Sequence, residues 1–146
     1  MPKFAKNLTQ KMKIVIIGAT GFIGSRLFSF LDKEEYDLTV VSRNVESARE
    51  ELGHHAEFCE WNGNSSDSLD RILKDAWAVI NLAGESLMGL WTASKKRKII
   101  DSRVTITEKI VNAIKHCTIK PKHFINASAI GIYKEDRRMD ERNFKE

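Results

Sequence analysis

The sequence has 146 residues, a length that suits one ordinary domain. Apolar residues make up 42% and charged residues 30%, and the chain has only 2 Pro and 8 Gly. This composition excludes the disordered, collagen-like and proline-rich linker classes. No apolar run approaches the roughly 20 residues that span a bilayer, so we expect no membrane partner.

The charge of the chain is concentrated near its start. The net charge of +4 comes from 24 basic and 20 acidic residues, and residues 1–13 hold four lysines and no acidic residue. A nucleic-acid partner would have to use this leader alone, and we expect none. We expect residues 1–11 to be a disordered basic leader and residues 134–146 to be a charged tail.

The cysteines and histidines give no metal signal. Cys59 and Cys117 fit no CxxC or zinc-binding spacing, and the four histidines show no metal-ligand spacing. We therefore expect no metal site. Two isolated cysteines, and a leader without the apolar segment of a signal peptide, favour a cytoplasmic location.

Short apolar runs alternate with helical patterns along the chain, which is typical of βαβ units and a parallel sheet. Strands are expected at residues 12–17, 38–41, 56–60, 76–82 and 123–127. Helices are expected at residues 22–31, 45–52, 67–74 and 92–115. Numbered along the chain, the strands of such a Rossmann-like, doubly wound α/β sheet should lie in the order 3-2-1-4-5.

Two of the helices carry more detailed expectations. The helix at residues 67–74 should be N-capped by Ser65 or Ser66. The long helix at residues 92–115 has apolar residues at helical spacing, which we expect to face the sheet. These residues are Ile100, Val104, Ile110, Val111 and Ile114.

A glycine-rich turn, GATGFIG, follows the first strand and opens the first helix. Gly18 permits the tight turn, Gly21 lets the backbone approach a pyrophosphate, and Gly24 lets the helix lie close to the sheet. The free N–H groups of the helix start favour phosphate. A turn without a ligand and a methyl-donor fold are the less favoured interpretations. The absence of the Walker lysine excludes a P-loop.

The residues after the second strand indicate which dinucleotide would bind. A carboxylate at that point would hold the ribose hydroxyls of NAD, but the sequence there is Ser42-Arg43-Asn44. The Arg43 guanidinium and the Ser42 hydroxyl can donate hydrogen bonds to a 2′-phosphate. NADP, including NADPH, is therefore favoured over NAD. The alternative is that Arg43 is a solvated loop residue.

The motifs GATGFIG, VVSRN, AVINLAGESL, the stretch at residues 91–103 and FINASAIGIY occur in this order along the chain. Together they resemble the N-terminal portion of the short-chain dehydrogenase/reductase superfamily. The closer resemblance is to its atypical, NAD-dependent epimerase/dehydratase-like (nucleoside-diphosphate-sugar epimerase) members. The resemblance implies an NAD(P)-binding Rossmann domain at residues 12–133.

The resemblance also implies a set of site residues. Arg103, on the long helix, would face the cofactor crevice, and Ser128 would act as the catalytic hydroxyl beside the substrate and nicotinamide. The phosphate-binding turn would comprise Gly18, Thr20, Gly21, Phe22, Ile23 and Gly24. Ser42 and Arg43 would meet the 2′-phosphate. The adenosine–ribose side would be lined by the backbone of Leu82, Ala83, Gly84 and Glu85.

The sequence departs from the superfamily at the catalytic tyrosine and in length. No Tyr-x-x-x-Lys pair is present, and Tyr133 is followed by Lys134 where the family has Tyr-Gly or a similar pair. Family members continue into further strands and a substrate region. We therefore expect a chain that is weakly active or inactive by itself. The alternative is a non-catalytic dinucleotide-sensing or interaction module, with a homodimer formed through an exposed edge strand or helix faces.

Overall fold

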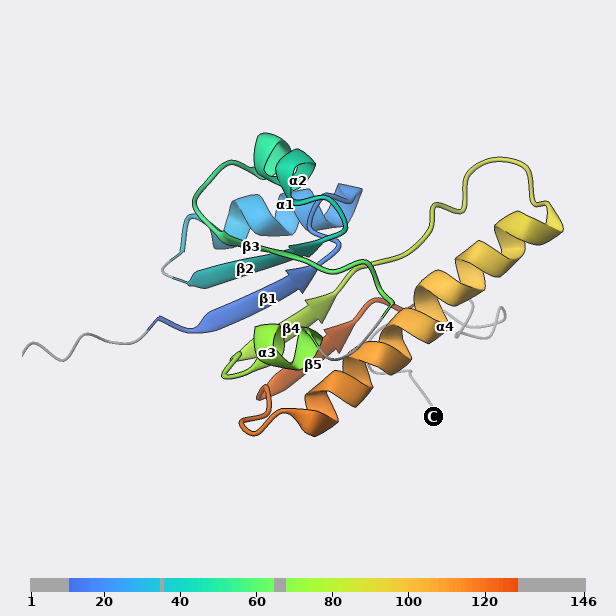
Figure 1. Cartoon of the computed structure of the whole chain (residues 1–146). Coiled ribbons are helices and arrows are strands. Elements are labelled where there is room, and N and C mark those ends of the chain that lie inside the picture. The colour runs from blue at the N-terminus through green and yellow to red at the C-terminus, as the bar shows by residue number, and fades with distance from the viewer. Residues whose placement is uncertain (1–10, 35, 65–67, 129–146) are drawn as a thin grey trace, which may run out of the picture.

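The computed structural model describes residues 11–34, 36–64 and 68–128, which form one parallel sheet with helices on both faces (Figure 1). The elements, in chain order, are β1 (Lys13–Ile17), α1 (Phe22–Leu31), β2 (Asp37–Ser42), α2 (Val45–Leu52), β3 (Glu57–Glu60), α3 (Leu69–Leu73), β4 (Ala78–Asn81), α4 (Ala93–His116) and β5 (His123–Asn126). All nine correspond to elements predicted from the sequence.

The five strands lie in the order β3-β2-β1-β4-β5, and every neighbouring pair is parallel. This confirms the predicted Rossmann-like, doubly wound arrangement. Ile17, the last residue of β1, pairs with Val41 of β2 and with Asn81 of β4. The register therefore brings the chain segments that follow these three strands to one edge of the sheet, here called the carboxyl edge.

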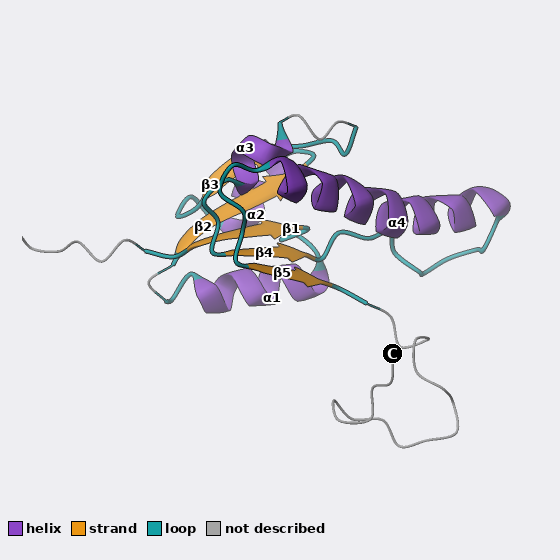
Figure 2. Ribbon diagram, turned by 90° about the horizontal axis from the view of Figure 1, so that it is seen from below, coloured by secondary structure: helices purple, strands orange, loops and turns teal. Residues whose placement is uncertain are grey.

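The continuous apolar run of β1 reflects burial on both of its faces. Ile14 and Ile16 pack into a core with Phe28 of α1. Val15 and Ile17, which point to the opposite face, pack into a second core. The second core also contains Leu69 and Leu73 of α3 and Ile110 and Ala113 of α4. Each face of the sheet thus has its own apolar core, with α1 and α2 over one face and α3 and α4 over the other (Figure 2).

The structure corrects the predicted inner face of the long helix. Ile110 is fully buried and Val111 and Ile114 are partly buried, but Ile100 is 59% exposed and Val104 is 52% exposed. The reason is length: a helix of 24 residues extends about 36 Å, more than strands of four to six residues can cover. The N-terminal half of α4 consequently extends beyond the strands (Figures 1 and 2).

The ends of the elements differ in part from the predictions. α3 begins at Leu69, and Ser68, at its N-cap position, makes no side-chain capping bond. Ser65 and Ser66, the expected caps, lie outside the described residues. So do most of the expected leader and all of the expected tail, including Lys134, together with Tyr133. Within the described ranges, no helix has both the length and the apolarity that crossing a membrane requires.

Strand β5 forms one edge of the sheet. It pairs with β4 alone among the described strands, and its four residues are all exposed. Phe124 is 37% exposed and Ile125 is 53% exposed. Because Val79 and Ile80, their partners on β4, point to opposite faces, Phe124 and Ile125 also lie on opposite faces of the sheet.

Gly24 is buried in α1, where the helix meets the glycine turn. A Cβ at this position would lie 2.3 Å from the Gly18 carbonyl oxygen and 2.8 Å from the Ala19 Cα. Both atoms belong to the backbone, so they cannot move aside as a flexible side chain would. The absence of a side chain at Gly24 is what allows the helix to start so close to the strand.

We expect Gly24→Ala to destabilise the protein by about 3 kcal/mol or more, because overpacking against backbone outweighs the roughly 1 kcal/mol that alanine gains in a helix. Gly53→Ala is the control: Gly53 has φ +85°, but a Cβ there would meet no atom within 4 Å. With ψ −167° its backbone lies in a region that essentially only glycine adopts, so the substitution should cost about 1–3 kcal/mol of strain, without any overpacking. Chemical denaturation followed by circular dichroism measures both. Equal losses would show that the close contact at Gly24 is relieved without cost.

Candidate functional site

The glycine turn lies at the carboxyl edge, between the end of β1 and the start of α1. Gly18 has φ +85°, and a Cβ there would lie 2.8 Å from the Ala83 nitrogen and 2.8 Å from the Leu82 carbonyl carbon. The Gly21 N–H donates to the Gly18 carbonyl oxygen at 3.2 Å and closes the turn. Gly18 is thus required both by its backbone conformation and by its contact with the segment after β4.

The outer side of this turn is open. Thr20 and Gly21 are exposed, and Phe22 and Ile23, the first residues of α1, are 87% and 65% exposed. Gly21 occupies the N-cap position without a side-chain capping bond, and no acidic residue lies in the first turn of the helix. The first N–H groups of a helix have no partner within the helix, so this end of α1 can accept an anion.

Ser42 is the last residue of β2, and Arg43 and Asn44 follow it. They lie next to the glycine turn, because Ile17 and Val41 are register partners. The Ser42 hydroxyl donates to the Asn44 carbonyl oxygen at 3.0 Å and accepts from the Asn44 N–H at 3.2 Å. The Asn44 side chain accepts from the Ser47 N–H and caps α2. Arg43 is exposed between these two residues. The β2 end therefore presents a cation and no carboxylate.

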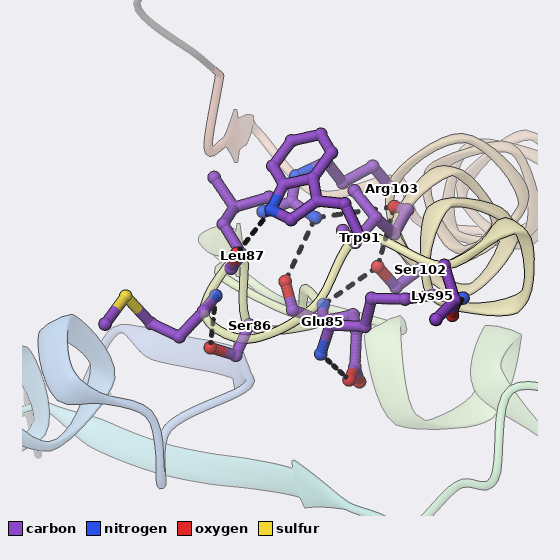
Figure 3. A network of polar contacts seen from close by, with 10 residues as sticks. Glu85, Ser86, Leu87, Trp91, Lys95, Ser102 and Arg103 are labelled. Carbon is purple, nitrogen blue, oxygen red and sulfur yellow. Dashed lines mark hydrogen bonds and ion pairs between the residues drawn. The ribbon is translucent and has the colours of Figure 1, made fainter.

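The segment after β4, residues 82–85, is held against both β1 and α4. The Leu82 N–H donates to the Ile17 carbonyl oxygen at 2.8 Å. On the other side, the Glu85 N–H donates to the Ser102 hydroxyl at 2.8 Å, and Arg103 Nη1 donates to the Glu85 carbonyl oxygen at 3.3 Å (Figure 3). Contacts from two elements thus fix the backbone that the resemblance assigns to the adenosine side.

Sequence analysis expected Arg103 to face the cofactor crevice; the structure places it beside residues 82–85, where its observed contacts are with protein backbone. Its guanidinium also donates to the Ile99 carbonyl oxygen, and its Nη2 would lie 3.4 Å from a Cβ placed on Gly84. Arg103 therefore packs over Gly84 and fastens this segment to α4. Its direct contact with a cofactor stays a prediction.

Glu85 forms an ion pair with Lys95 of α4, with 2.7 Å between the carboxylate oxygen and the ammonium nitrogen (Figure 3). The hydrogen bond and the charge of Lys95 lower the pKa of the Glu85 carboxyl, and Lys98 and Arg43 lower it further. Glu85 is thus a carboxylate among cations from two parts of the chain, one of which follows β2.

A second polar cluster joins β4, β5 and α4. Asn81, only 3% exposed, donates from Nδ2 to the Asn126 side-chain oxygen at 2.7 Å and to the Thr107 hydroxyl at 3.4 Å. Its own side-chain oxygen accepts from the Ala83 N–H at 3.2 Å. Ser128 is exposed and follows β5 by two residues, so it lies at the carboxyl edge. No hydrogen bond links its hydroxyl to another described residue.

The structure therefore brings most predicted site residues to one edge and adds several that sequence analysis missed. The added residues are Asn81, Lys95, Ser102 and Thr107. Asn81 directly precedes the predicted Leu82-Ala83-Gly84-Glu85 motif and Ser102 directly precedes Arg103, so their places in the motifs were a usable signal. Nothing in the spacing of Lys95 from Glu85 indicated an ion pair.

Other chemistry on the molecule lies elsewhere. An open pocket of about 330 Å³ lies at the amino ends of the strands, opposite the carboxyl edge. It is lined by the first residues of β1 and β3 and includes Cys59. Burial raises the pKa of the Cys59 thiol, which keeps it protonated and a poor nucleophile at neutral pH. No group of three or more potential metal-ligating side chains occurs among the residues that the structure describes.

Comparison with known proteins identifies the family. The sequence profile of the "NAD dependent epimerase/dehydratase family" matches residues 14–146. The chain is 34% identical over 122 residues to "Epimerase family protein YfhF" from Bacillus subtilis, covering 84% of this chain and 39% of that protein. The chain thus spans about two fifths of the length of this relative.

Solved structures show the same likeness. The structure of the human epimerase family protein SDR39U1 (isoform2) with NADPH superposes with a TM-score of 0.66 at 25% identity, over 84% of this chain and 38% of the human one. UDP-glucuronic acid 4-epimerase from Bacillus cereus, in complex with UDP-glucuronic acid and NAD, gives 0.70 at 26% identity, over 90% and 45%. These partial matches agree with the expected N-terminal portion. Since the profile match begins within β1 and continues to the last residue, this chain belongs to the NAD dependent epimerase/dehydratase family.

Proposed function

We propose that this chain binds NADP(H) at the carboxyl edge of its sheet, as the dinucleotide-binding region of an epimerase- or reductase-like protein. The observation that carries the proposal is the register pairing of Ile17 with Val41. It sets the open glycine turn beside Arg43, so a surface suited to a diphosphate adjoins a cation suited to a further phosphate.

The diphosphate would lie against the glycine turn. The N–H groups at the start of α1 would donate to its oxygens, and the lack of a side chain at Gly21 would let the phosphates approach the backbone. Thr20, Phe22 and Ile23 are exposed around this position and would contact the same ligand. The backbone of residues 82–85, fixed by Ser102 and Arg103, would line the adenosine–ribose side.

The choice of NADP over NAD rests on the residues after β2. The complexes of the two structural relatives contain NADPH in one case and NAD in the other, so membership of the family leaves this choice open. In this chain Arg43 is exposed at the β2 end and no carboxylate replaces it. The Ser42 hydroxyl would join Arg43 on the 2′-phosphate by exchanging its bond to the Asn44 carbonyl oxygen.

The coenzyme supplies hydride transfer at a hydroxyl- or carbonyl-bearing carbon, and a sugar nucleotide is the substrate class that fits the family. Ser128 would hydrogen-bond the reacting oxygen of the substrate. Because the relatives are more than twice as long as the matched region, we propose that residues beyond it complete their substrate sites and that this chain alone is weakly active or inactive.

A second candidate function is a non-catalytic dinucleotide-sensing module that self-associates. The exposed apolar residues of β5 favour it, because an edge strand with free backbone groups can pair with another copy. The occupant we propose for this edge is a second copy of the chain.

The coenzyme proposal predicts a selective effect of Arg43→Ala. We expect NADPH affinity to fall about ten- to a hundredfold while NADH affinity changes little, because one charged contact with the 2′-phosphate contributes about 1.5–3 kcal/mol. Quenching of protein fluorescence, with both coenzymes, measures the two affinities. Arg71→Ala, which removes a cation lining the pocket at the opposite edge, is the control and should alter neither. Equal losses for NADPH and NADH on Arg43→Ala would refute the phosphate assignment.

A turnover assay distinguishes an active enzyme from a non-catalytic binding module. With NADPH bound, we expect little or no oxidation of the coenzyme across a panel of carbonyl compounds and sugar nucleotides. The absorbance of NADPH measures this oxidation. Robust turnover would refute the proposed inactivity, and Ser128→Ala should then reduce it if the serine contacts the reacting oxygen.

Self-association at β5 is tested by light scattering during size-exclusion chromatography. We expect a concentration-dependent dimer for the wild-type chain and a monomer for Ile125→Lys, because the new charge would be buried on pairing. Ile119→Lys is the matched control, since Ile119 is 55% exposed outside the edge strand. A wild-type chain that stays monomeric at all concentrations would remove the second candidate function.

A further inference from the structure

Glu85 introduces a charge problem at the proposed coenzyme site. Its backbone lies in the segment that would line the adenosine–ribose side. The register of β1 with β2 and with β4 places Arg43 and this segment on either side of the glycine turn, and the charge of Arg43 contributes to lowering the pKa of the Glu85 carboxyl. A 2′-phosphate bound at Arg43 would bring up to two further negative charges into the same region. Carboxylate and phosphate would then compete for one guanidinium and repel each other.

The backbone of Glu85 is held in place, so this segment cannot move and carry the carboxylate away from the site. Ser102 accepts from its N–H and Arg103 donates to its carbonyl oxygen, and both residues belong to α4 (Figure 3). Lys95 comes from the start of the same helix. There Thr92 accepts from the Lys95 N–H at 3.1 Å and caps the helix. One helix therefore holds the backbone of Glu85 and also presents the cation that pairs with its side chain.

The pair lies at the surface, and its effect rests on its close geometry. The side chain of Lys95 is 20% exposed and that of Glu85 is 36% exposed, and the two charged groups are 2.7 Å apart. A pair of this geometry is a charge-assisted hydrogen bond, which is shorter and stronger than a neutral one. Lys95 can thus offset the negative charge of Glu85, so that Arg43 is left to attract an anion from solvent.

We propose that Lys95 is a specificity-determining residue for the coenzyme: by pairing with Glu85 it keeps Arg43 available to the 2′-phosphate and so favours NADPH over NADH. The inference rests on the proposed function, because it concerns the same site. Lys95 acts here through Glu85 and is a positioning residue, without contact with the coenzyme. The charge of Lys98 also lowers the pKa of the Glu85 carboxyl, in the same direction as that of Lys95.

The test compares NADPH and NADH affinities for the full chain and for Lys95→Met, Glu85→Gln and the double variant Glu85→Gln/Lys95→Met, by fluorescence quenching at low and high salt. Lys95→Met should weaken NADPH binding about three- to tenfold, and more at low salt, because an unpaired carboxylate then faces the phosphate. NADH binding should change less than about twofold. The double variant should regain most of the wild-type preference, because it removes the unpaired carboxylate together with the lysine.

Lys96→Met is the matched control. It removes the same charge from the neighbouring position of α4, but the ion pair of Glu85 is with Lys95 and not with Lys96, so the coenzyme ratio should stay unchanged. Equal losses of NADPH and NADH on Lys95→Met would overturn the inference in favour of a merely structural role. A double variant as weak as Lys95→Met would also overturn it, in favour of direct contact between Lys95 and the phosphate. A wild-type chain that binds neither coenzyme would instead overturn the proposed function, and this inference with it.

Discussion

The site depends on a close contact between two pieces of backbone at the carboxyl edge. The turn at Gly18 lies so near Leu82 and Ala83 that a Cβ would come within 2.8 Å of their main-chain atoms. This contact locks the segment after β4 to the end of β1, and the bond from the Leu82 N–H to the Ile17 carbonyl oxygen continues the pairing of β4 with β1 beyond the strand. A ligand bound on the turn would therefore meet the second segment in a fixed place.

The segment at residues 82–85 is held by β1 on one side and by α4 on the other. Ser102 and Arg103 bind the two backbone groups of Glu85, and Asn81 binds the Ala83 N–H while joining β4 to β5. These polar groups lie where the second apolar core gives way to solvent. Because every buried polar side-chain atom of the described residues has a partner, the edge of the sheet is ordered by hydrogen bonds where apolar packing ends. Such an edge is prepared for a ligand before the ligand arrives.

The apolar pattern was sufficient to predict the strands, because a strand buried on both faces, such as the run at residues 14–17, reads as an unbroken apolar run. Their order followed from the usual doubly wound arrangement and its right-handed crossovers. The apolar pattern was insufficient for α4, where Ile100 and Val104 continue the apolar spacing past the end of the sheet and are exposed. The positions of the glycine turn and of Arg43 could be predicted because each directly follows its own strand. The Glu85–Lys95 pair could not, because it depends on how a loop folds back onto the next helix.

Among the described residues, those proposed to bind the coenzyme are held by more contacts than the one proposed to be catalytic. Arg43, the glycine turn and the clamped segment at Glu85 surround the position proposed for the phosphates and adenosine, and the turn and the segment are held by several independent contacts. Ser128 is the one predicted catalytic hydroxyl, and it follows the exposed edge strand without a hydrogen bond to another described residue. Affinity requires only that a ligand be met by groups in place, whereas catalysis requires groups held within a fraction of an ångström of the reacting atoms. Within the part of the chain that the structure describes, the first condition has a structural basis at the carboxyl edge, while the second would need contacts around Ser128 from outside that part.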